Sequence, residues 1–140
     1  MQPRSILGAG AALLVLAGGV ALANPVRDAV MAALAAEAKT EKPDFTGFSA
    51  ERGAAFYRAS QTGGGPDTPS CTSCHGPDPR EGGRTRAGKA IAPMAVSKSP
   101  DRYTDTDKVA LWFERNCKSV LGRSCTPLEK GDFLSFMLAQ

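Results

Sequence analysis

The stretch "CTSCHGPDPREGG", Cys71 to Gly83, is the segment on which the fold of this chain depends. It holds two cysteines separated by two residues, Cys71 and Cys74, with His75 directly after them. Three kinds of site share this pattern: a covalent haem site, a zinc site and a redox dithiol. His75 is the single histidine among the 140 residues, so the choice between the three determines most of what can be inferred about function.

The spacing favours covalent haem. Two thiols at this separation can attach one haem, and the histidine that follows is then held under the iron as its proximal ligand. Zinc needs four ligands, so it would also recruit Cys117 and Cys125 in reduced form. A redox dithiol is typical of a helix start beside a βαβ pattern, and the sequence carries no strand signal.

The first 23 residues have the three regions of a secretory signal peptide. Arg4 gives a positive start, residues 6–20 form an apolar run, and Ala21-Leu22-Ala23 is a cleavage site of small residues. We predict cleavage after Ala23 and a periplasmic protein that does not span the membrane. An uncleaved anchor helix is the alternative, because the apolar run is close to the shortest that crosses a bilayer.

The net charge and the predicted compartment bear on the expected partners and on the state of the remaining cysteines. The formal charge of +3 falls to +2 when Arg4 leaves with the signal peptide, and the basic residues form no run, so nucleic acid is not an expected partner. Export places the chain in an oxidising compartment, where spare thiols pair. Cys117 and Cys125 are therefore expected to form a disulfide.

Periodicity and capping signals predict an all-α fold with long loops. Pro25 at a first turn, Ser49 as an N-cap and a capping box at Thr126 to Glu129 mark three helix starts. The predicted helices cover residues 24–40, 50–60, 104–117 and a last segment from 127 onward. Residues 76–99 are predicted as a loop and residues 118–125 as a connector. A domain of this size with long loops has a small core, so we expect a covalent cross-link or a bound cofactor to stabilise it.

The residues considered so far do not identify the second axial ligand of a haem. His75 is already used, Met31 lies in the first helix and Met137 in the last, which leaves Met94 as the loop methionine. If Met94 binds the iron, the protein is a plain electron carrier. If it does not, the Met94 side chain packs against the haem. Trp112 could stack near a haem propionate, but a core aromatic on the helix face is the expected role. Arg115 and Arg123 are expected in solvent, with neutralisation of haem propionates or contact with a partner as the alternatives.

The order of the elements resembles class I cytochromes c, in which the N- and C-terminal helices cross at a small residue, here Gly53. The tail is more specific. Its segments closely resemble the oxygen-binding, high-spin c-type cytochromes known as Sphaeroides haem protein, and the wider bacterial family of unknown function that shares this tail. The matching segments are "WFERNC" at 112–117, "VLGRSCTP" at 120–127, "EKGD" at 129–132, and upstream "FSAERGAAFY" and "CTSCHG". The resemblance covers residues 45–140, the cytochrome c domain, and leaves residues 24–44 as a helical N-terminal extension.

The resemblance implies one covalent haem c in a class I cytochrome c-like helical fold. It implies Asn116 as the sixth ligand, braced by a disulfide between Cys117 and Cys125, with Met94 as the alternative ligand. An amide oxygen is a weak ligand for ferrous iron, so reduction would release it and admit O2, NO or CO. The implied function is electron transfer and gas binding rather than catalysis, with a dihaem cytochrome c and a membrane cytochrome b as partners. A haem enzyme that reduces NO or peroxide is the remaining alternative, for which carboxylates, arginines or Tyr103 would supply protons.

Overall fold

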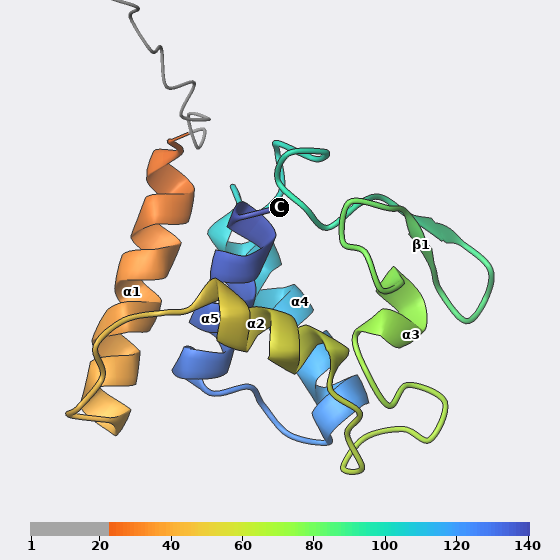
Figure 1. The fold of residues 1–140 in the computed structure, drawn as a ribbon, viewed down its shortest axis with the longest axis horizontal. Helices are drawn as coiled ribbons and strands as arrows, with labels where there is room; N and C mark the ends of the chain where they lie inside the picture. The colour runs from red at the N-terminus through yellow and green to blue at the C-terminus, as the bar shows by residue number, and fades with distance from the viewer. Residues whose placement is uncertain (1–22) are drawn as a thin grey trace, which may run out of the picture.

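The computed structural model describes residues 23–140, so the predicted signal peptide lies outside the described residues except for Ala23. This part of the chain forms five α-helices and one two-stranded sheet (Figure 1). In chain order they are α1 (Pro25–Glu41), α2 (Ala50–Arg58), α3 (Thr72–His75), β1 (Gly83–Arg84), β2 (Ala90–Ile91), α4 (Thr106–Leu121) and α5 (Pro127–Leu138). The mostly helical fold that the sequence predicts is confirmed.

The crossing of α2 and α5 forms the centre of the molecule. Gly53 lies where the helices meet, and a side chain at this position would overlap the backbone of Asp132. The buried Asp132 carboxylate accepts hydrogen bonds from the Arg52 guanidinium at 2.7 and 2.8 Å and from the Ser49 backbone N–H at 2.7 Å. The role of Gly53 in close helix approach, implied by the resemblance, is therefore confirmed.

The first predicted helix forms as α1 and packs against α5. Its first turn is capped by the Asn24 side chain, and Val30 and Leu34 are buried in the same apolar cluster as residues of α5. At its N-terminal end, Arg27 donates a hydrogen bond to the carbonyl of Pro100 at 2.7 Å. The helix is thus part of the core. No helix among residues 23–140 is both long and apolar enough to cross a membrane.

Two predictions about the middle of the chain are wrong. The sequence indicated no strands, yet β1 and β2 pair in an antiparallel hairpin, with Gly83 opposite Ile91. Strands of two residues are too short to show an alternating pattern. The hairpin and α1 lie on opposite sides of the α2–α5 pair (Figure 1).

The second correction concerns the predicted connector at 118–125, because α4 continues to Leu121. Cys117 and Leu121 are both buried and stand one turn apart, so the last turn of α4 still contributes an apolar face. The helix ends at Gly122, whose φ of 70° is the left-handed conformation that glycine adopts at helix ends.

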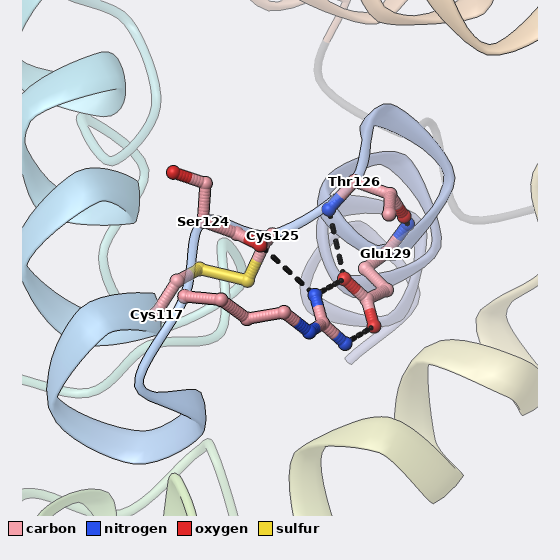
Figure 2. Close-up of a disulfide and its surroundings, with 6 residues drawn as sticks. Cys117, Ser124, Cys125, Thr126 and Glu129 are labelled. Atoms are coloured by element: carbon pink, nitrogen blue, oxygen red, sulfur yellow. Dashed lines mark hydrogen bonds and ion pairs between the residues drawn. A yellow bond between two sulfur atoms is a disulfide. The ribbon is translucent and has the colours of Figure 1, made fainter. Parts of the chain in front are cut away.

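The expected disulfide between Cys117 and Cys125 is present and ties the end of α4 to the start of α5 (Figure 2). The Cα atoms of the two cysteines are 5.5 Å apart. Next to it, the predicted capping box of α5 is confirmed by hydrogen bonds in both directions between Thr126 and Glu129. Arg123 donates two further hydrogen bonds to Glu129, at 2.7 and 2.8 Å.

Candidate haem site

A cavity of about 1010 Å³ opens between the cysteine motif, the loop after β2 and α4. Cofactor sites in proteins commonly enclose about 300–1,000 Å³, so this cavity is large enough for a cofactor of considerable size. It is lined by Phe56, Thr68, Ser70, Cys71, Cys74, His75, Thr85, Ile91, Ala92, Met94, residues 99–105, Lys108, Val109, Trp112, Phe113, Asn116, Cys117, Ser119, Val120, Leu121, Cys125 and Phe133. The predicted site residues are therefore all found around one cavity.

The single turn of α3 presents the three residues of the motif to the cavity. The His75 backbone N–H donates to the Cys71 carbonyl at 3.1 Å, which closes the turn, and neither Cys71 nor Cys74 forms a disulfide. Burial raises the pKa of the Cys71 thiol to about 11, so this thiol is neutral at pH 7. A redox dithiol has the opposite property, because its nucleophilic cysteine has a lowered pKa.

The surroundings of His75 suit a metal-binding imidazole. Burial lowers the pKa of the ring, and the nearby positive charge of Arg102 lowers it further, so the imidazole is neutral and able to bind a metal. Its Nδ1 atom is buried and has no hydrogen-bond partner among the described residues, so the ring is not held by the protein through that nitrogen. Two free thiols and this imidazole on one cavity wall fit a covalently attached haem.

A zinc site finds less support in the same residues. Cys117 and Cys125 are bonded to each other, so their sulfurs are not available as thiolate ligands beside Cys71 and Cys74. Within residues 23–140, no three side chains of His, Cys, Asp or Glu stand together in a group that could hold a metal ion.

Asn116 lies on the α4 wall of the cavity. Trp112 stands four residues earlier, which places it on the same face of the helix, and it lines the cavity too. The Asn116 side chain is exposed and makes no hydrogen bond to another residue of the described chain. Cys117, the next residue, is buried and held by the disulfide. The disulfide therefore holds the backbone directly beside Asn116.

Met94 lines the cavity from the loop after β2, and its backbone is held at two points. Its N–H donates to the Pro79 carbonyl at 2.8 Å, and its carbonyl accepts from the Tyr103 hydroxyl at 3.0 Å. Its side chain is 7% exposed and belongs to the core cluster that contains Tyr57 and Phe133. Pro79 follows His75 by four residues, so Met94 is anchored beside the cysteine motif.

The expectation that Trp112 is a core aromatic is wrong, because 52% of its surface is exposed. The core-facing side of α4 carries Val109 and Phe113 instead, and Phe113 packs edge-on against Phe133 with ring centroids 5.6 Å apart. The Arg115 guanidinium lies over the Trp112 ring, 5.7 Å from its centroid. Arg123 does not line the cavity and is bonded to Glu129.

Arg102 shapes the cavity, although no motif in the sequence singles it out. Its guanidinium donates to the carbonyls of Pro93 at 2.5 Å and Ala92 at 2.7 Å, which fixes the loop that carries Met94. Tyr103 follows in the left-handed conformation, with a φ of 63°. Both residues lie in an aperiodic stretch, where hydrogen bonds between loop segments leave no pattern in the sequence.

The family described as "Domain of unknown function (DUF1924)" matches residues 43–137. The chain belongs to this family. It is 58% identical over 91 residues to the cytochrome c-type protein SHP of Cereibacter sphaeroides, across 65% of this chain and 70% of SHP. It is also 36% identical over 86 residues to cytochrome c'' of Methylophilus methylotrophus, across 61% of this chain and 59% of that protein.

Solved structures agree with these relationships. The structure of oxidised SHP, described as an oxygen-binding cytochrome c, matches with a TM-score of 0.76 and 47% identity, over 84% of this chain and all of SHP. The crystal structure of oxidised cytochrome c'' from M. methylotrophus matches with a TM-score of 0.72 and 30% identity, over 82% of this chain and 94% of that one. The SHP-like cytochrome fold expected from the sequence is confirmed.

Family membership also assigns the cofactor. A c-type cytochrome holds its haem through a Cys-x-x-Cys-His segment, and the family relationship therefore gives this chain one covalently bound haem c. Cys71 and Cys74 are the residues that would hold it through thioether bonds, and His75 is the residue that would bind the iron. The assignment of Asn116, or alternatively Met94, as a second iron ligand stays a prediction.

Proposed function

We propose that the protein is a periplasmic electron-transfer cytochrome c that binds O2, NO or CO, with Asn116 as a sixth ligand that leaves on reduction. The observation that carries the proposal is the position of Asn116. It lines the cavity that Cys71, Cys74 and His75 also line, and its side chain makes no hydrogen bond within the described chain that would hold it elsewhere.

The chemistry of the amide supports a labile bond. Haem c supplies an iron that alternates between the ferric and ferrous states and, when ferrous, has affinity for diatomic gases. The Asn116 carbonyl is a neutral, hard oxygen donor, which suits ferric iron better than ferrous iron. The disulfide at Cys117 keeps the backbone beside Asn116 in place while its side chain swings away. The solution structure of cytochrome c'' from M. methylotrophus, 29% identical to this chain, is likewise described in terms of haem-ligand detachment.

The surroundings of Met94 argue against a thioether ligand. Its backbone is bonded to Pro79 and Tyr103, and its side chain is buried in the core. The side chain lines the cavity as part of this cluster, and its packing there accounts for its burial without a bond to iron. Met94 is therefore better explained as a core residue beside the cysteine motif.

Tyr103, one candidate proton donor for an enzyme that reduces NO or peroxide, is poorly suited to that role. Such an enzyme needs a proton donor at the iron. The Tyr103 hydroxyl lines the cavity but donates to the Met94 carbonyl, and burial raises its pKa, so it is a poor proton source. We further propose that the redox partners are a dihaem cytochrome c and a membrane cytochrome b, as the sequence resemblance implies.

Optical spectra test the iron ligand directly. The chain, matured in a periplasm that attaches haem, would be recorded oxidised, then reduced, then with CO, beside Asn116→Ala and Met94→Leu. We expect a high-spin reduced wild type that binds CO promptly. Asn116→Ala should change the oxidised spectrum but leave the reduced one unchanged, whereas Met94→Leu should alter neither.

The opposite pattern would reject the proposal. A reduced wild type that is low-spin and indifferent to CO, and that loses this spectrum in Met94→Leu, would identify a conventional electron carrier with a thioether ligand. Met94→Leu is the matched control because it conserves the volume of a buried side chain while removing the sulfur.

A further inference from the structure

The buried Tyr57 connects α2 to the segment that binds haem. Its side chain has no exposed surface, and its hydroxyl donates a hydrogen bond of 2.7 Å to the carbonyl of Gly76. Gly76 directly follows His75. A side chain of the central helix pair therefore reaches the residue next to the iron-binding histidine.

The position of Tyr57 is fixed by the crossing of α2 and α5. It stands one turn after Gly53, the contact point of the two helices, and so lies on the same face of α2. Its ring packs against Phe133 and Phe136 of α5, with centroids 6.2 and 5.7 Å away. Burial raises the pKa of Tyr57 to about 12, so the hydroxyl remains a donor at neutral pH.

The segment that receives this hydrogen bond is short. Helix α3 has four residues, and its C-cap Gly76, with a left-handed φ of 73°, donates its backbone N–H to the Thr72 carbonyl at 3.0 Å. The next residue is Pro77, which has no N–H. Among the described residues, Tyr57 is the donor that holds the Gly76 carbonyl, so this hydrogen bond fixes the peptide unit directly after His75.

We propose that Tyr57 is a positioning residue for His75: its hydroxyl, by holding the Gly76 carbonyl, sets the orientation of the imidazole relative to the haem. The inference rests on the haem c that family membership assigns. It does not depend on whether Asn116 leaves the iron.

The test uses Tyr57→Phe in the haem-loaded protein, which removes one oxygen and keeps the ring contacts with Phe133 and Phe136. The readout is the proton NMR spectrum of the ferric cyanide complex, in which the haem methyl shifts report the orientation of the histidine plane. Cyanide occupies the distal side in every variant, so the readout is insensitive to Asn116. We expect Tyr57→Phe to shift or broaden the haem methyl resonances.

Ser49→Ala is the control. Ser49 caps the start of the same helix, α2, where its hydroxyl accepts a hydrogen bond from the Arg52 backbone N–H at 3.2 Å, and it does not line the cavity, so this variant also loses one hydrogen bond of α2. Both should lower the melting temperature, but only Tyr57→Phe should change the haem methyl pattern. A wild-type pattern in Tyr57→Phe, or an equal change in both variants, would overturn the proposal.

Discussion

The α2–α5 crossing and the α4 side of the haem cavity are held together in different ways. At the crossing, Gly53 allows backbone to meet backbone, and the ion pair between Arg52 and Asp132 closes the contact. Helix α4 has only sparse backbone contact with the other helices. It is attached by the Cys117 disulfide, by the Phe113 ring, and by hydrogen bonds from the 63–68 loop to the Ser119 carbonyl.

The difference shows which part of the fold depends on the cofactor. Protein atoms fill the crossing, whereas the space between α4 and the cysteine motif is a cavity of about 1010 Å³. The crossing is therefore expected to be stable through its own contacts. The α4 wall is expected to need the haem to complete its packing.

The largest effect should come from preventing haem attachment with Cys71→Ala and Cys74→Ala together. Without haem, the apolar side chains that line the cavity, Phe56, Val109 and Phe113 among them, would lose their contact with the cofactor and face water. We expect a loss of about 5 kcal/mol or more in the free energy of unfolding, comparable to the whole stability of a small domain. Hydrogen exchange should show protection lost in α4 and residues 92–105 but retained in α2 and α5. Equal loss of protection in both regions, relative to the haem-loaded wild type, would contradict the comparison.

Gly53→Ala is expected to destabilise the α2–α5 crossing rather than the cavity. The new methyl group would overlap the Asp132 backbone, which cannot move without separating α2 from α5. Overpacking of this kind costs about 1–3 kcal/mol and occasionally more, and we expect about 3 kcal/mol here because backbone must shift. Gly65→Ala is the control, since its nearest neighbour is the Thr68 hydroxyl at 3.2 Å, a side chain that can turn away. Denaturant unfolding measures both, and equal costs would show that the crossing is not closely packed.

The sequence predicted most helices because their signals are local. The Ser49 cap, the Thr126–Glu129 capping box and the apolar stripe of α1 each lie within a few residues of the helix they define. The hairpin was missed because its strands of two residues show no alternating pattern. The last turn of α4 and the exposed position of Trp112 were missed because they depend on which face of α4 packs against distant segments.

The haem site also combines residues that a local sequence pattern identifies with residues that it does not. The cysteine motif is a local signature, and Asn116 was selected only through the resemblance of the tail to a known family. The contacts that hold the cavity open join residues far apart in the chain, as Tyr57 and Gly76 do. A tyrosine hydroxyl directed at a loop carbonyl looks, in sequence, like any other helix aromatic.

The smallest effect concerns Glu129, whose interactions fasten the start of α5 beside the disulfide (Figure 2). Hydrogen bonds from Arg123, and then from the Thr126 backbone N–H, lower the pKa of this carboxyl below its ordinary value of 4.5. Because the folded pKa is lowered, the stabilisation is complete above about pH 4.5 and is lost as the pH falls through the folded pKa. Arg123 is 53% exposed, so solvent screens the pair, and the Glu129 charge is expected to contribute less than about 1 kcal/mol.

The measurement is the difference in unfolding free energy between wild type and Glu129→Gln from pH 7 to pH 3. Taking the difference cancels the other carboxyl groups, whose titration is common to both proteins. The wild type should be more stable at pH 7 and lose this advantage below pH 4.5. A difference that stays constant to pH 3 would mean that the Glu129 charge does not fasten α5 to the end of α4. The attachment of the cavity wall would then rest on the covalent link between Cys117 and Cys125 and on packing alone.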